Sequence, residues 1–291
     1  MGAMTSASNP LMLSADRQLA FLGAGSMNGA ILRGILAAGH APGAVTATLR
    51  TNAKAAALRD ETGITVFVGE QEPDANRRAA AGADVVFLGV KPIGVQALCR
   101  EIAGSLRPDT VVVSVAAAVT IEAISACLNP GQPVIRTMPN TPLMVGMGAV
   151  GLSAGDHVTD AALAEVVALF AGSGLVHVVP EAQLDAVSAV SGSGPAYVFY
   201  LVDAMAAAGV ELGLAPELSM DLARATVAGA GKMLAAPGAD PVAMRRSVTS
   251  PNGTTERAIA EFEAGGIPGI IARGARAAAD RAAQISTELA G

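Results

Sequence analysis

Short apolar runs rich in Val and Ile recur between Gln18 and Pro180, and stretches long enough for a helix separate them. The runs read QLAFLG, VTATLR, ITVFV, DVVFLGV, TVVVSV, PVIRTMP, AVGLSA and VHVVP. Strands of this length that alternate with helical segments are typical of βαβ units, whose sheet is buried on both faces. The sequence therefore predicts an open α/β domain over residues 18–180.

The strand pattern stops after Pro180, and the rest of the chain is rich in Ala, Leu and Met. Several segments there begin with Pro near the first turn and stop at Gly, as helices do. The predicted helices span residues 183–190, 195–208, 216–234, 241–246, 255–264 and 267–289. Because 291 residues exceed one typical domain, we expect a second, all-helical domain over residues 181–291.

The composition restricts what the chain can bind. A formal charge of −6, with 19 Lys and Arg residues and no basic cluster, argues against binding to nucleic acid or to an anionic membrane surface. Hydrophobic residues make up 52% of the chain, yet the longest uncharged run, residues 137–155, contains Pro, Gly and Asn and would make a poor membrane helix. The surplus apolar surface instead predicts a homo-oligomer.

The cysteines and the start of the chain predict the compartment. Cys99 and Cys127 lie in segments expected to be buried, which fits a reducing compartment without structural disulfides. No residues have metal-binding spacing, so no metal site is expected. Residues 1–17 lack the basic start, apolar run and cleavage site of a signal peptide. We therefore expect a cytoplasmic protein.

A glycine pattern follows the first predicted strand, in the segment FLGAGSMNGAILRGIL. Gly23 permits a tight turn, Gly25 lets the backbone approach a pyrophosphate, and the following helix offers amide donors at its N-terminus. Asn28 stands at the third glycine position, where close packing of helix on strand is needed. The position after a first strand is the context that this fingerprint requires, so the sequence predicts dinucleotide binding.

The end of the second predicted strand indicates which dinucleotide is bound. NAD enzymes commonly place an Asp or Glu there, but VTATLRTNAK has Arg50, and no acid occurs between Ala44 and Asp60. A fixed positive charge suits the 2′-phosphate, so the sequence favours NADPH; the alternative is that Arg50 is an ordinary surface residue at a strand end. The small residues of VSVAAAVT leave room for a flat ring, while Lys91 could contact ligand or water.

Two stretches of the helical half stand out. SGSGPAYVFYLVDAMAAAG feeds a helix that is apolar on almost every side, which predicts subunit packing. Its polar residues Tyr197, Tyr200 and Asp203 could be catalytic, but satisfied polar groups in a core are the commoner case. SVTSPNGTTERA, residues 247–258, interrupts the helices with a Pro, an Asn-Gly pair and several hydroxyl residues.

Taken together, FLGAGSMNGAI with VKP, RTMPNTPLMVGMG with SGSGPAYVF, and VTSPNGTT resemble the pyrroline-5-carboxylate reductase family from about Leu19 to Arg281. The resemblance implies an N-terminal Rossmann domain and an all-α domain that dimerises by interlocking with a partner, with larger assemblies up to a decamer of dimers. It also implies reduction of Δ1-pyrroline-5-carboxylate to L-proline with NADPH, or with NADH, the last step of proline biosynthesis.

The resemblance assigns site residues position by position. Cofactor contacts fall on Gly23, Ala24, Gly25, Ser26, Met27, Asn28, Arg50, Thr51, Asn76, Val90, Lys91, Pro92, Ala116 and Ala117. Substrate contacts fall on Glu181, Ser247, Ser250, Thr254 and Thr255. The chain departs from the family pattern at Asn28, at Ala118 and at PNG in place of PGG; Asn252 should tolerate the left-handed backbone of that turn.

The substrate is a cyclic imine, a good electrophile once protonated, so the enzyme mainly has to position it. We expect amides around Gly253 and Thr254 to bind its carboxylate and the Thr255 hydroxyl to hydrogen-bond the ring nitrogen, within reach of the nicotinamide in the crevice between the domains.

Other functions fit parts of the same pattern. A β-hydroxyacid dehydrogenase would need a catalytic Lys where the chain has Val198. A reductase of another cyclic imine and a non-catalytic dinucleotide-binding sensor remain alternatives.

Overall fold

A computed structural model describes residues 16–290, and these residues form two compact units. The first unit runs up to Gly192 and includes the chain from Ala279 onward, and the second is Ser193–Ala278. Gln96 donates a hydrogen bond to the carbonyl oxygen of Leu289 at 3.0 Å. The end of the chain is therefore part of the first unit and not of the helical one.

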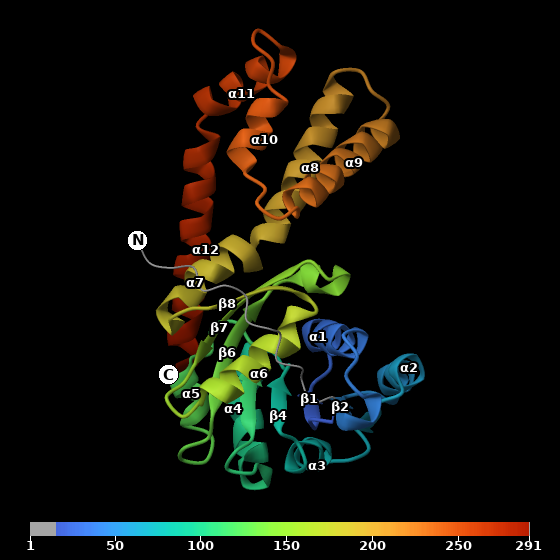
Figure 1. Cartoon of the computed structure of the whole chain (residues 1–291), viewed down its shortest axis with the longest axis vertical. Helices are drawn as coiled ribbons and strands as arrows, with labels where there is room; N and C mark the ends of the chain where they lie inside the picture. The colour runs from blue at the N-terminus through green and yellow to red at the C-terminus, as the bar shows by residue number, and fades with distance from the viewer. Residues whose placement is uncertain (1–15, 291) are drawn as a thin grey trace. The chain divides into compact units, whose positions relative to one another are not determined.

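The first unit is built on a sheet whose eight described strands follow the order β3-β2-β1-β4-β5-β6-β7-β8 (Figure 1). They are β1 (Leu19–Leu22), β2 (Val45–Leu49), β3 (Thr65–Val68), β4 (Val85–Leu88), β5 (Val111–Ser114), β6 (Val134–Pro139), β7 (Gly148–Ala154) and β8 (Gly174–Val178). Neighbouring strands are parallel except β6 and β7. Every run predicted as a strand forms one, and the predicted α/β class is confirmed.

Helices cover both faces of this sheet because its strands are apolar on both sides. Leu19 and Phe21 of β1 join one core, and Ala20 and Leu22 join the other. The first core contains side chains from α1 (Ser26–Ala37), α2 (Asn52–Thr62) and α6 (Asp160–Ala171). The second contains side chains from α3 (Ala75–Ala81), α4 (Pro92–Ile102) and α5 (Ile121–Ser125).

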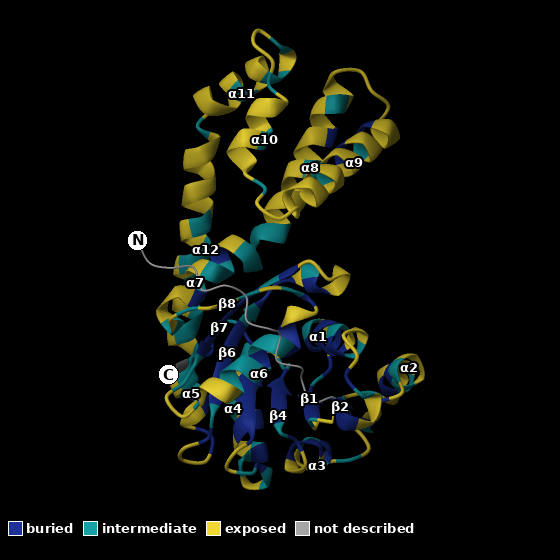
Figure 2. Ribbon diagram, viewed as in Figure 1, coloured by how far each residue is buried: buried dark blue, intermediate teal, exposed yellow. Residues whose placement is uncertain are grey.

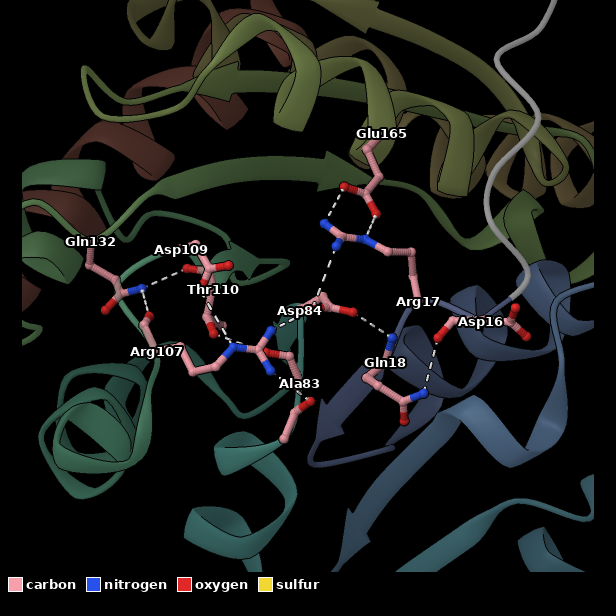
Figure 3. Close-up of polar contacts among 11 residues, drawn as sticks. Asp16, Arg17, Gln18, Ala83, Asp84, Arg107, Asp109, Thr110, Gln132 and Glu165 are labelled. Atoms are coloured by element: carbon pink, nitrogen blue, oxygen red, sulfur yellow. Dashed lines mark hydrogen bonds and ion pairs between the residues drawn. The ribbon is translucent and has the colours of Figure 1, made fainter.

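A charged cluster ties the amino ends of the strands together (Figure 3). Arg17, just before β1, donates to Glu165 of α6 through two bonds of 2.5 and 2.8 Å. It also lies 3.5 Å from Asp84, which precedes β4 and pairs in turn with Arg107. These contacts occupy the amino edge of the sheet and leave the opposite edge, where the strands end, to the ligand crevice expected in such folds.

The second unit consists of α8 (Gly194–Glu211), α9 (Pro216–Leu234), α10 (Pro241–Ser247), α11 (Thr254–Ala264) and the first half of α12 (Ile267–Ala290), up to Ala278. In this unit only Ala206, Ser219 and Ala223 are buried among the described residues, and Figure 2 shows its helices largely exposed. On α8, Phe199 is 68% and Tyr200 is 77% exposed. Apolar area of this kind is the sort that a partner subunit covers. No helix in the described part of the chain is long and apolar enough to cross a membrane.

The helix predicted over residues 183–190 has a different form in the structure. An α-helical turn, α7 (Leu184–Val187), passes into a π-helical segment at Ser188–Gly192. The side-chain amide of Asn140, which follows β6, donates to the carbonyl oxygen of Ser191 at 3.1 Å. This contact from outside the helix holds the widened turn, and local sequence pattern does not reveal it.

Candidate active site

The glycine loop joins β1 to α1 at the point where the strand order reverses, the place where sheets of this type bind dinucleotides. Gly23 has φ +80°, a conformation that favours glycine, and its N–H donates to the Thr48 hydroxyl oxygen at 2.9 Å. No side chain caps α1 at Gly25, and nothing lies within 4 Å of where a Cβ on Gly25 would be. The amides of Ala24 and Gly25 donate to the carbonyl oxygens of Thr48 and Gly23, so the free amides at this site are those of the first turn of α1. Together with the space at Gly25 they suit a pyrophosphate, and the residues present fit a dinucleotide.

Asn28 is buried, and its side chain is directed to β4. Its Nδ2 donates to the carbonyl oxygen of Phe87 at 3.3 Å, while its Oδ1 has no partner among the described residues. The amide fills the space that a Cβ on Gly89 would need. The tolerance for a larger residue at position 28 therefore comes from a glycine at the end of the neighbouring strand.

The end of β2 holds Arg50, which is almost fully exposed, and Thr51, the residue that precedes α2. Arg50 Nε lies 3.6 Å from Glu70 Oε1, a carboxylate that follows β3. A search for an acid along β2 alone misses Glu70, because the residue is contributed by the next strand. Its only sequence signal is the Gly-Glu pair at the end of ITVFV.

Asn76, at the start of α3, is joined to the glycine loop through Thr48. The Thr48 hydroxyl donates to Asn76 Oδ1 at 2.8 Å and accepts from the Gly23 amide. Asn76 Nδ2 donates to the Glu101 carboxylate at 3.2 and 3.3 Å. The structure therefore brings Asn76 next to the loop, as the resemblance implies, and adds Thr48, which sequence reasoning missed.

The loops after β4 and β5 complete this edge of the sheet. A Cβ on Gly23 would lie 3.2 Å from Val90 Cγ1, so Val90 packs beside the glycine loop. Lys91 is exposed and precedes α4, whose first residue is Pro92. After β5, the predicted nicotinamide neighbours Ala116 and Ala117 are buried and half-buried. The predicted cofactor residues thus gather at the carboxyl ends of adjacent strands.

Glu181 is held by groups of its own unit. Its Oε1 accepts from the Ile121 N–H at 2.8 Å and from Arg136 Nη1 at 3.2 Å. Arg136 lies on β6 with its side chain only 6% exposed, and its Nη2 also donates to Asp185 at 3.3 Å. The carboxylate therefore caps the first turn of α5 and neutralises a buried guanidinium. Its predicted contact with substrate remains a prediction.

The other predicted substrate residues lie in the second unit, between Ser247 at the end of α10 and Thr255 in the first turn of α11. Asn252 has φ +58°, which confirms the left-handed backbone expected there. The Gly253 N–H donates to the Ser250 carbonyl oxygen at 3.0 Å, and the Ser247 hydroxyl donates to the Met244 carbonyl oxygen at 2.8 Å. Helix α11 begins at Thr254, one residue earlier than predicted, with no side-chain cap at Gly253.

That helix start has consequences for ligand binding. Thr254 is exposed and Thr255 is half-buried. Because the Gly253 amide is used within the turn, the amides of the first helical residues, from Thr254 onward, are the ones that suit a carboxylate. Of the two amides predicted to bind the substrate carboxylate, that of Gly253 is engaged within the turn, and the role of the Thr254 amide stays a prediction.

The fold and the glycine loop define a two-part enzyme with a dinucleotide-binding sheet, in the class of dinucleotide-dependent oxidoreductases. Residues 181–285 match the family model for pyrroline-5-carboxylate reductase dimerisation, and residues 18–118 match that for NADP oxidoreductase, coenzyme F420-dependent. Pyrroline-5-carboxylate reductase of Pseudomonas aeruginosa is 38% identical, with 94% of this chain and 98% of the relative covered.

Solved structures of the same enzyme are similar to this chain over most of its length. The pyrroline-5-carboxylate reductase of Coxiella burnetii superposes with a TM-score of 0.86 at 34% identity, over 93% of this chain and 99% of that one. The pyrroline carboxylate reductase of Plasmodium falciparum, solved with NADP bound, shares the fold at 23% identity, over 94% of this chain and 99% of that one, with a TM-score of 0.78. The chain belongs to the pyrroline-5-carboxylate reductase family, and the predicted family and enzyme class are confirmed.

Proposed function

We propose that this chain reduces Δ1-pyrroline-5-carboxylate to L-proline with NADPH, with NADH as the alternative cofactor. Family membership supports the reaction, and the open glycine loop with Arg50 beside it supports the cofactor. When bound, the reduced nicotinamide supplies the hydride that is added to C5 of the imine. The alanines after β5 offer it a flat, apolar surface.

The uncapped start of α11 carries the proposal for the substrate site. An 11-residue helix presents free N–H groups at its first turn, and these favour a carboxylate. Glu256 of the same turn accepts from the Asn252 N–H at 2.8 Å, and its charge offsets part of the positive end of the helix dipole. The left-handed Asn252 turns the chain so that Thr254 and Thr255 occupy that first turn. In this role the amides hold the substrate carboxylate, and the Thr255 hydroxyl hydrogen-bonds the ring nitrogen. Ser247 and Ser250 line the same loop.

The two predicted domains take different roles in this proposal. Residues 18–180 bind the dinucleotide, and residues 181–291 bind substrate and form the subunit interface, which the exposed apolar face of α8 supports. A homodimer, and a decamer of dimers as the larger assembly, are the expected states. A cytoplasmic location stays a prediction.

Thr255→Val tests the catalytic assignment, because valine keeps the shape of threonine and removes the hydroxyl. A hydrogen bond to a charged group contributes about 1.5–3 kcal/mol, so we expect kcat/KM for pyrroline-5-carboxylate to fall about 10- to 100-fold. Thr255→Ser should restore most of it, and affinity for NADPH should not change. Thr287→Val, which removes an exposed helix hydroxyl elsewhere, is the control. Turnover of the Thr255→Val variant equal to that of the wild type would show that Thr255 has no such role.

A further inference from the structure

Arg50 and Glu70 are held side by side by the backbone as well as by their charges. The Gly69 N–H donates to the Leu49 carbonyl oxygen at 2.9 Å, and the Glu70 N–H donates to the Arg50 carbonyl oxygen at 3.1 Å. These bonds continue the pairing of β2 with β3 beyond the ends of the two strands. The carboxylate of Glu70 is therefore kept near the guanidinium, at 3.6 Å, even though both side chains are exposed.

This pair brings together two side chains that favour different nucleotides. An acid at the end of β2 accepts hydrogen bonds from the ribose of NAD, and an Arg there accommodates the 2′-phosphate of NADP. Here β2 supplies the Arg and β3 supplies the acid. Arg78 pairs with Glu72 and Asp74, and Arg50 is the cation that pairs with Glu70 among the described ion pairs.

We propose that Glu70 is a specificity-determining residue that reduces the preference for NADPH over NADH. It competes with the 2′-phosphate for Arg50 and repels that phosphate, and it accepts a hydrogen bond from the free 2′-hydroxyl of NADH. The proposal rests on dinucleotide binding at this edge, as the proposed function requires. Because both side chains are exposed, water and salt screen the interaction, and the effect is a matter of several-fold and not of orders of magnitude.

Glu70→Gln is the test, because it removes the charge and keeps the shape. Calorimetric titration of the full-length protein with 2′,5′-ADP and with ADP compares ligands with and without a 2′-phosphate. We expect Glu70→Gln to raise the affinity for 2′,5′-ADP about three- to tenfold and to leave the affinity for ADP unchanged. The gain over the wild type should shrink in 0.5 M salt, which screens the charges. The ratio of kcat/KM for NADPH to that for NADH should rise by a similar factor.

Two further variants make the result decisive. Glu61→Gln breaks another exposed pair, the closer one with Arg33 at 2.6 Å, and should leave the ratio of the affinities for 2′,5′-ADP and ADP unchanged. In an Arg50→Gln background, the gain from Glu70→Gln should be smaller. The proposed role of Glu70 is wrong if Glu70→Gln changes the ratio of the affinities for 2′,5′-ADP and ADP less than twofold, or if Glu61→Gln changes it equally. Dinucleotide binding itself would stand in either case. If the wild-type protein binds neither ligand, dinucleotide binding and the proposed function fail with it.

Discussion

Replacement of Glu181 by Ala should lower the free energy of unfolding more than it lowers the affinity for substrate. The change removes two hydrogen bonds, to the Ile121 N–H and to Arg136, and leaves a guanidinium that is 6% exposed with Asp185 as its remaining carboxylate. Breaking a buried ion pair costs about 3–5 kcal/mol. Glu181 is 31% exposed and Asp185 still pairs with the guanidinium, so we expect a smaller loss, about 2–3 kcal/mol. Glu181→Gln, which keeps an acceptor, should lose about 1 kcal/mol.

Urea unfolding followed by far-UV circular dichroism measures this loss, since the chain has no Trp to report by fluorescence. Protein concentration must be equal for all variants, because stability of an oligomer depends on it. Glu61→Ala, in the exposed pair with Arg33, should change the midpoint little. The steady-state KM for pyrroline-5-carboxylate distinguishes the two roles of Glu181. A KM raised more than tenfold with unchanged stability would mean that Glu181 binds substrate, and our structural explanation would be wrong.

Two further predictions concern the cores of the first unit. Phe87 is fully buried, stacked on Phe21 at 4.5 Å and edge-on to Phe170 at 6.0 Å, so Phe87→Ala should cost about 3–5 kcal/mol in the same urea assay, and a loss below about 1 kcal/mol would contradict this packing. Burial raises the pKa of the Cys99 thiol from 9.0 to about 12, with Cys127 nearby adding to the effect. The folded chain thus keeps a proton that the unfolded chain loses above pH 9, so this thiol's contribution to stability is complete below pH 9 and decreases as pH rises toward 12. Cys99 should resist iodoacetamide at pH 9 until urea unfolds the protein, and rapid labelling of the native protein would refute the assignment.

The strands could be predicted from sequence because each is a short run whose side chains are apolar on both faces. In β1, for example, Phe21 and Leu22 enter different cores, so the whole run is hydrophobic and stands out from the helices. The left-handed Asn252 could be predicted for a similar reason, since a Pro-Asn-Gly turn restricts the backbone locally. Features that are fixed by neighbours in sequence were predictable.

Contacts between side chains of different strands could not be predicted in this way. Glu70 and Arg50 are twenty positions apart, and only the β2–β3 pairing brings them together. Glu181 meets Arg136 because β6 lies beside the segment that leaves β8, which no periodicity reveals. The role proposed for Glu70 in nucleotide preference rests on such a pair, and the absence of an acid along β2 describes only part of the charge at that edge.

Asn28 shows how a departure from a family pattern can be absorbed away from the ligand. At the third glycine position a larger side chain should obstruct the approach of helix to strand. Here the amide is directed to β4, donates to the Phe87 carbonyl oxygen, and occupies the space left by Gly89. Gly25, where a side chain would block a pyrophosphate, stays open. Asn28 and Gly89 thus depend on one another, and the Asn28 side chain leaves the space at Gly25 open.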